Sequence, residues 1–168
     1  MKKLLCALAA VAIAAPGIAL AGAGGTSCAA AQEIFPQTTY SGNTTGNPNF
    51  IGVFGALPSP GPDAVYKFTS DGQVTTSINV TITGGWNAGI FLTATCAGNA
   101  GNIIEAATGP AATFSMPIDN GSGGPLAAGT TYYVTMSGNP ADNSGPSGAY
   151  SFGTPNPLPV TLQEFSID

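Results

Sequence analysis

Residues 73–83 (QVTTSINVTIT) alternate between apolar and polar side chains, and this pattern limits the fold more than any other part of the chain. One parity carries Val74, Ile78, Val80 and Ile82, with Thr76 between them, and the other carries only hydroxyl and amide groups. Successive side chains of a β-strand point to opposite faces, so the segment predicts a strand with one apolar face and one polar face. A lone strand cannot cover its apolar face, so a second layer must pack against it.

Similar alternation recurs between clusters of Gly, Pro, Asn and Asp, which are typical of turns. Residues 41–49 are predicted as a turn region, and the short connector at residues 70–72 predicts a hairpin between its flanking strands. About eight or nine short strands, with no long helical periodicity after residue 21, predict an all-β, antiparallel β-sandwich. The expected strands cover residues 34–40, 63–69, 73–83, 89–96, 102–108, 112–118, 130–137 and 147–153.

The first residues have the composition of a secretory signal peptide. Lys2 and Lys3 precede an apolar run over residues 4–20, and residues 19–21 (ALA) form a small-x-small cleavage pattern. We therefore expect a signal peptide at residues 1–21, a sandwich domain at 22–153, and a proline-rich linker with a C-terminal strand at 154–168. The implied location is secreted, either extracellular or at the surface of a bacterium. A retained membrane anchor is the alternative.

Charge and composition exclude several classes of function. After residue 21 the chain keeps one cation, Lys67, against eight carboxylates, and it contains no His and no Arg. Binding to nucleic acid or to anionic lipid needs cations. Without His, the Ser-His-Asp and Cys-His arrangements cannot form, so we expect no enzyme and no catalytic residues. A weak hydrolase built on two carboxylates, with Asp63 and Glu105 as the residues to test, is the remaining enzymatic alternative.

Cys28 and Cys96 are the two cysteines that remain after the predicted signal peptide. In an exported chain an even number of cysteines predicts a disulfide, and with two cysteines the pairing is forced. Two buried free thiols are the alternative.

Calcium is the one cofactor that the sequence suggests, because hard cations take oxygen ligands. The candidate ligands are Asp63, Asp119, Asn120, Asp142 and Asn143, most of which lie in predicted loops. Ordinary turn chemistry is the alternative for the loop residues, since they lack the spacing of an EF-hand. For Asp63, the alternative is a carboxylate that accepts backbone hydrogen bonds at a corner.

The C-terminal segment predicts an assembly strand. Its apolar residues are Val160 and Leu162 on one parity and Phe165 and Ile167 on the other. Preceded by a stiff linker with several prolines, this strand either pairs with a neighbouring subunit or folds back onto its own sandwich. A head-to-tail contact of the first kind would build open filaments.

Four short motifs resemble the bacterial pre-peptidase C-terminal domain, over roughly residues 28–153. They lie at residues 63–69, 89–96, 129–134 and 148–152. The resemblance implies a secreted, jelly-roll-like sandwich without catalysis of its own, with a role in binding, secretion or stabilisation, and with calcium in some members. The chain departs from that family because we expect no peptidase domain among its residues. It also carries residues 86–88 (WNA) where relatives often place an Asp.

These patterns lead to two functional hypotheses. The first is a secreted, non-catalytic structural or adhesive subunit of the bacterial cell surface that associates with itself or with other surface proteins, and that self-assembles into extracellular filaments through its C-terminal strand. The second is a carbohydrate- or calcium-binding accessory module. Trp86 and Tyr133 are its candidate sugar-stacking residues, with a place at the rim of the core as the alternative for the tryptophan.

Overall fold

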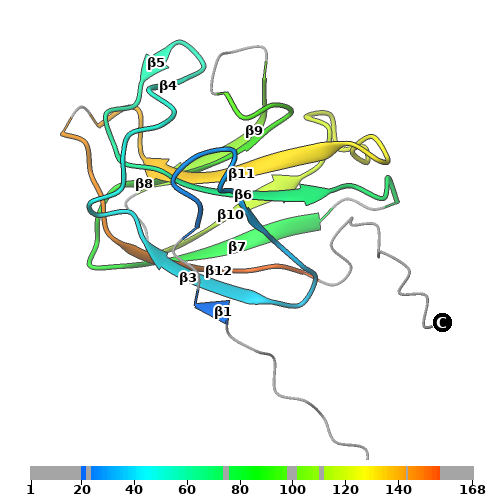
Figure 1. The fold of residues 1–168 in the computed structure, drawn as a ribbon, viewed down its shortest axis with the longest axis horizontal. Helices are drawn as coiled ribbons and strands as arrows, with labels where there is room; N and C mark the ends of the chain where they lie inside the picture. Colours follow the sequence, from blue (N-terminus) through cyan, green and yellow to red (C-terminus); the bar gives the residue numbers. More distant parts are fainter. Residues whose placement is uncertain are drawn as a thin grey trace, which may run out of the picture.

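The computed structural model describes residues 20–21, 24–73, 76–97, 102–109, 112–142 and 144–155. Two five-stranded sheets pack face to face (Figure 1), which confirms the predicted β-sandwich. Sheet A has the strand order β1-β3-β12-β7-β10, sheet B has the order β2-β6-β11-β8-β9, and β4 pairs with β5 in a small ribbon. The strands are β1 Leu20–Ala21, β2 Gln32–Glu33, β3 Thr39–Asn43, β4 Val53–Phe54, β5 Leu57–Pro58, β6 Ala64–Thr69, β7 Thr76–Thr83, β8 Ala88–Thr93, β9 Ile103–Gly109, β10 Thr113–Ile118, β11 Thr131–Gly138 and β12 Ala149–Gly153.

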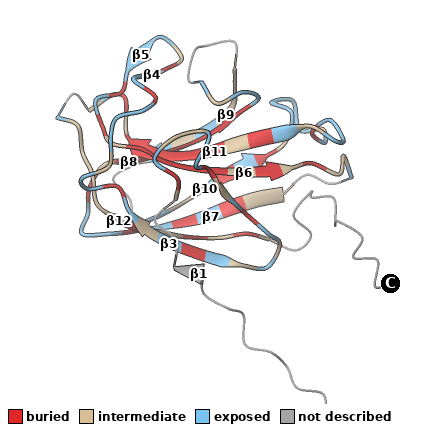
Figure 2. Ribbon diagram, viewed as in Figure 1, coloured by how far each residue is buried: buried red, intermediate tan, exposed pale blue. Residues whose placement is uncertain are grey.

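The core lies between the two sheets and is built as the alternation predicts. On β7 the side chains of Ile78, Val80 and Ile82 are buried, whereas the intervening polar side chains are exposed. The three buried side chains of β7 belong to one cluster with apolar side chains of sheet B such as Phe68 and Leu92. Figure 2 shows this burial as bands along the strands of both sheets. Within the described residues, no helix is long and apolar enough to cross a membrane.

The predicted hairpin between residues 63–69 and 73–83 is wrong, because β6 lies in sheet B and β7 in sheet A. One edge of β6 pairs with β11 and the other with the two residues of β2, whereas β7 pairs with β12 and β10. The connector is held by the two residues just before β11: the N–H of Ser70 donates to the carbonyl of Thr130 (2.9 Å), and the N–H of Gly129 donates back to Ser70 (2.8 Å). The short turn therefore carries the chain from one sheet to the other.

The region before residue 50 also differs from the prediction. The expected strand at 34–40 is interrupted, since β2 ends at Glu33 and β3 begins at Thr39. The expected turn at 41–49 begins later, because Ser41 to Asn43 continue β3 and pair with β12. Gly42 fits this place because a Cβ there would lie 2.5 Å from the hydroxyl of Tyr150. The absence of a side chain at Gly42 therefore allows close packing within a strand and does not mark a turn.

The outer face of sheet B is covered as well, by residues 48–62, which include β4 and β5. Phe54 stacks on Phe91 of β8 with ring centroids 3.6 Å apart, and Ile51 and Ile103 complete this second apolar cluster. For this reason all six residues of β8 are buried, on both faces of the sheet. Strand β8 thus has the burial of a central strand between two layers.

Candidate functional site

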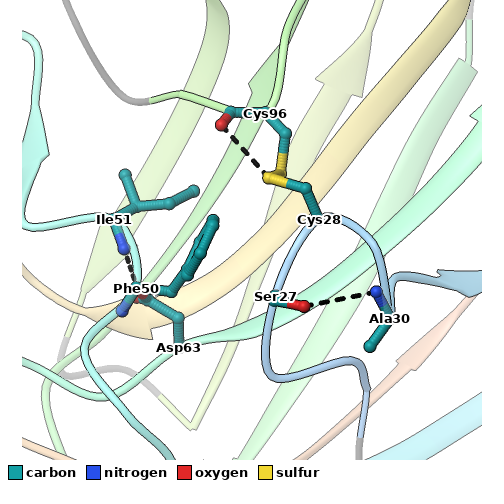
Figure 3. Close-up of a disulfide and its surroundings, with 7 residues drawn as sticks. All are labelled: Ser27, Cys28, Ala30, Phe50, Ile51, Asp63 and Cys96. Atoms are coloured by element: carbon teal, nitrogen blue, oxygen red, sulfur yellow. Dashed lines mark hydrogen bonds between the residues drawn. A yellow bond between two sulfur atoms is a disulfide. The ribbon is translucent and has the colours of Figure 1, made fainter.

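Cys28 and Cys96 form the predicted disulfide, with Cα atoms 5.8 Å apart (Figure 3). The bond ties the segment before β2 to the chain just after β8, across 68 residues of sequence. Closing a loop of that length lowers the entropy of the unfolded chain by an amount worth about 4 kcal/mol of stability. The linkage holds the N-terminal segment in place, where the N–H of Gly25 donates to Val65 of β6 (2.8 Å).

Asp63 is fully buried at the corner that leads into β6. Its Oδ2 accepts hydrogen bonds from the N–H groups of Phe50 (2.8 Å) and Ile51 (2.5 Å), as Figure 3 illustrates. Its Oδ1 is buried and has no hydrogen-bond partner among the described atoms. Burial raises the pKa of Asp63 to about 6, against the lowering effect of these N–H groups and of the Ser137 hydroxyl. Of the two sequence interpretations, the geometry matches the carboxylate that fixes a corner.

Asp119 and Asn120 lie in the loop after β10, and their side chains are engaged by that loop. The Oδ1 of Asp119 accepts the N–H of Gly121 (2.7 Å), and the Oδ1 of Asn120 accepts the N–H groups of Ser122 and Gly124 (3.0 Å each). Partial burial and the adjacent Asp119 carboxylate raise the pKa of Glu105 on β9. The structure thus brings Glu105 and Asp119 together, a pair that the sequence did not indicate.

Asp142 lies in a second polar loop, between β11 and β12. Its Oδ1 accepts hydrogen bonds from the hydroxyl (2.7 Å) and the N–H (3.1 Å) of Ser144, which lower the pKa of Asp142. Its Oδ2 accepts a hydrogen bond from the amide of Asn87 (3.4 Å), while Asn143 lies outside the described residues. Within the described part of the chain, no three His, Cys, Asp or Glu side chains gather in one place. Calcium binding at these residues stays a prediction.

Trp86 belongs to the core cluster, where its indole N–H donates to the carbonyl of Ala149 (3.0 Å). A Cβ on Gly148 would lie 2.3 Å from the indole, so the ring packs directly on the backbone there. Tyr133 lies on β11 and faces the opposite side of sheet B from the buried side chains of Tyr132 and Val134. The tryptophan therefore occupies the core-rim position that was the alternative to a sugar platform.

The outer face of sheet A is polar and uncharged. Rows of side chains run across it in register, and Ser41, Ser151, Thr81 and Thr113 form one such row over four strands. Most of these side chains are exposed, and none is ionisable. A hydroxyl-rich face of this kind offers hydrogen bonds without long-range charge.

The β10 edge of sheet A is blocked by a proline. Directly opposed residues of an antiparallel pair alternate between hydrogen-bonded and non-bonded pairs. The N–H of Ile82 donates to Ala112 (2.8 Å) next to this ladder, which places the backbone groups of Thr113, Ser115 and residue 117 on the outward side. Residue 117 is Pro117, which has no N–H, and proline at such a position discourages pairing with another strand.

The β3 edge of sheet A has the opposite character. At each end of the β3–β12 ladder a backbone N–H donates to a carbonyl of the opposite segment, from Thr44 at one end (3.0 Å) and from Thr154 at the other (2.9 Å). Counting in twos from these bonds, the backbone N–H groups of Thr39, Ser41 and Asn43 point away from β12. In the described part of the chain, only the two residues of β1 lie along this edge, and they pair with β3 in parallel (Figure 1).

The edges of sheet B are shorter or irregular. Beyond β6 lies β2, a strand of only two residues, beside a bridge between Gly25 and Val65. At the other edge, β9 carries Glu105, and the β8–β9 register shifts between Leu92 and Thr93. Bulges, charges and short length all discourage pairing with another chain. Among the described edges, β3 therefore presents the most regular row of outward N–H and C=O groups.

The predicted assembly residues Val160, Leu162, Phe165 and Ile167 lie outside the described residues, as do residues 1–19 of the predicted signal peptide. Sequence reasoning missed the β3 edge, because residues 41–43 have the composition of a turn. It also missed the cover over sheet B. The aromatic residues of 48–62 were a signal for that cover, but nothing in them showed which face they would pack on.

Comparison of the chain with models of known protein families, with curated proteins and with solved structures finds no match, so the resemblance to the pre-peptidase C-terminal domain stays a prediction.

Proposed function

We propose that this protein is an exported, non-catalytic structural or adhesive subunit that assembles head to tail at or beyond the bacterial surface. In the proposed contact, the C-terminal strand of one subunit pairs with a sheet edge of the next. Each subunit then offers one donor strand and one acceptor edge, and the contact repeats without closing.

The observation that carries the proposal is the difference between the two edges of sheet A. Pro117 interrupts the β10 edge, whereas β3 points the N–H groups of Thr39, Ser41 and Asn43 outward over a regular five-residue strand. Proteins normally protect such an edge, because it is a template for pairing with another chain. An edge left regular on one side of a sheet and blocked on the other supports a directed strand contact.

The use of the polar side chains agrees with a subunit that makes contacts and does no chemistry. The buried Asp63 carboxylate fixes a corner, and Asp119 and Asp142 cap their own loops. The disulfide supports an oxidising destination, since such bonds persist outside the cytoplasm.

The test uses the mature chain from Gly22 and three variants, all examined by negative-stain electron microscopy and by sedimentation. Deleting residues 156–168 removes the proposed donor. Ser41→Pro removes an outward N–H of the proposed acceptor but no bond to β12. Ser115→Pro is the matched control, because it removes an outward N–H from the already blocked β10 edge. Near-ultraviolet circular dichroism checks that each variant keeps its core.

We expect filaments from the mature chain and from Ser115→Pro, and monomers from the other two variants. The proposal is overturned if the mature chain stays monomeric, or if the truncated chain still forms the same multimers. If truncation abolishes filaments while Ser41→Pro does not, the tail is the donor but β3 is not its acceptor.

A carbohydrate-binding accessory module is the second candidate, favoured by the uncharged, hydroxyl-rich outer face of sheet A. Hydroxyl and amide groups in register could form hydrogen bonds with a polysaccharide. A glycan array separates the candidates, because binding that is lost with Thr81→Val but kept after deletion of residues 156–168 would place recognition on this face. A rise in melting temperature with added calcium would support the calcium form of the module.

A further inference from the structure

We propose that the end of the signal peptide protects the β3 edge in the precursor, and that its removal opens this edge to the C-terminal strand of a second copy. This inference rests on the proposed function and adds its regulation. Hydrolysis of the bond between Ala21 and Gly22 by a signal peptidase consumes one water, and it leaves a carboxylate on Ala21 and an amine on Gly22. Assembly is thereby coupled to export.

The leader residues occupy the acceptor edge itself. Leu20 lies opposite Tyr40 and Ala21 opposite Ser41, so β1 adds to sheet A as its outermost strand. The same two residues belong to the small-x-small pattern that predicts cleavage after residue 21. Cleavage at this point would remove all of β1 and none of β3.

A strand is the occupant that fits the vacated edge. Its backbone would meet the outward groups of β3, and its inward side chains would lie beside Tyr40, which is fully buried and stacks on Phe152 with ring centroids 5.2 Å apart. The C-terminal residues offer alternating apolar side chains at Val160 and Leu162. Side chains on alternate positions of an added strand give such contacts their specificity.

The point at which the chain leaves β12 favours the tail of a second copy, over the tail of the same molecule, as the strand that pairs with β3. The chain leaves β12 beside β3, where the N–H of Gln37 donates to the carbonyl of Pro155 (3.3 Å). A tail returning to the far side of β3 in the same molecule must cross the end of that strand within residues 156–159, about two strand spacings or 10 Å. Pro157 and Pro159 favour a straight, extended path over that short distance.

The test measures amide hydrogen exchange at the β3 edge in chains that end at Pro155, which lack the tail and therefore cannot assemble through it. The described core and the disulfide lie within residues 24–155, so we expect this truncation to keep the fold. One chain begins at Gly22, a second begins at Pro16 and keeps the leader strand, and a third carries Leu20→Pro and Ala21→Pro in the longer form. Amide hydrogen exchange at Thr39, Ser41 and Asn43 is followed by NMR, alone and with a synthetic peptide of residues 158–168.

We expect the edge amides of the longer chain to exchange about tenfold more slowly than those of the chain from Gly22, and the proline form to exchange like the latter. The peptide should protect the same amides in the chain from Gly22, and it should bind the longer chain about tenfold more weakly. Equal exchange and equal peptide binding in all three chains would overturn the regulation while leaving tail-dependent assembly intact. Protection elsewhere, with β3 unchanged, would overturn β3 as the acceptor.

Discussion

The buried carboxylate of Asp63 makes the stability of the sandwich depend on pH in an unusual direction. Burial raises the pKa of Asp63 to about 6 from an ordinary value of 3.8. The folded protein therefore holds the proton more tightly than the unfolded chain does. The stabilisation from that proton is complete below the unfolded pKa, and it is lost as the pH rises through the folded pKa.

The size of the effect follows from the two pKa values. Each unit of difference corresponds to about 1.4 kcal/mol, so protonation of Asp63 contributes about 3 kcal/mol of stability that is present near pH 3 and absent near pH 8. The raised pKa of Glu105 acts in the same direction and the lowered pKa of Asp142 acts in the opposite one. The contributions of Glu105 and Asp142 cancel when wild type is compared with a variant in which only residue 63 no longer titrates.

Asp63→Asn is that variant. Its amide oxygen still accepts the N–H groups of Phe50 and Ile51, and its side chain is neutral at every pH. Urea denaturation of both proteins with the disulfide intact should give equal free energies of unfolding near pH 3, and an advantage of about 3 kcal/mol for the variant near pH 8. Asp63→Ala is the control, because it also carries no titratable group but leaves two N–H groups unpaired; it should be less stable than Asp63→Asn by about 1–3 kcal/mol at every pH.

Parallel stability curves for wild type and Asp63→Asn across this range would refute the reasoning. That result would mean that the two N–H donors stabilise the carboxylate enough to offset its burial.

Three further predictions concern the core. Replacing Cys28 and Cys96 by Ser should lower the free energy of unfolding by about 4 kcal/mol, and a urea midpoint equal to wild type would contradict the entropic role of the disulfide. Tyr66→Phe should lower the free energy of unfolding by about 1–3 kcal/mol, because the hydroxyls of Tyr66 and Tyr150 are 2.7 Å apart and buried. In a double-mutant cycle, replacing both tyrosines by Phe should recover part of that loss. Additive effects of the two single substitutions would argue against an energetic coupling between the hydroxyls. Gly148→Ala should displace the neighbouring indole, cost about 1–3 kcal/mol and shift the tryptophan fluorescence, whereas unchanged fluorescence would show that the ring has room to move.

The sequence predicts the strands well where one face is apolar and the other polar. Strand β7 and strand β11 lie within one to three residues of their expected bounds, because alternation is a local property. Which strands pair is not local. Strands β6 and β7 follow each other closely along the chain but lie in different sheets, because β6 pairs with β11, some sixty residues away, and β7 pairs with β12.

The candidate site also combines features that local sequence predicts with features that depend on which strands pair. The Cys28–Cys96 pairing follows from the number of cysteines, and the corner role of Asp63 follows from its place before a strand. The open edge of β3 could not be predicted, because it depends on which strand is outermost in the finished sheet. Ser41-Gly42-Asn43 has turn composition, and only its register with β12 makes it a strand.

The most direct measurement of head-to-tail assembly is the mass of a mixture of two blocked mature chains. Ser41→Pro keeps the tail but lacks the acceptor edge, and the chain ending at Pro155 keeps the edge but lacks the tail. Light scattering after size-exclusion chromatography should find each chain monomeric alone and a one-to-one dimer in the mixture that grows no further. A mixture that elutes as two separate monomers, while the unblocked mature chain forms filaments, would contradict pairing of the tail with β3.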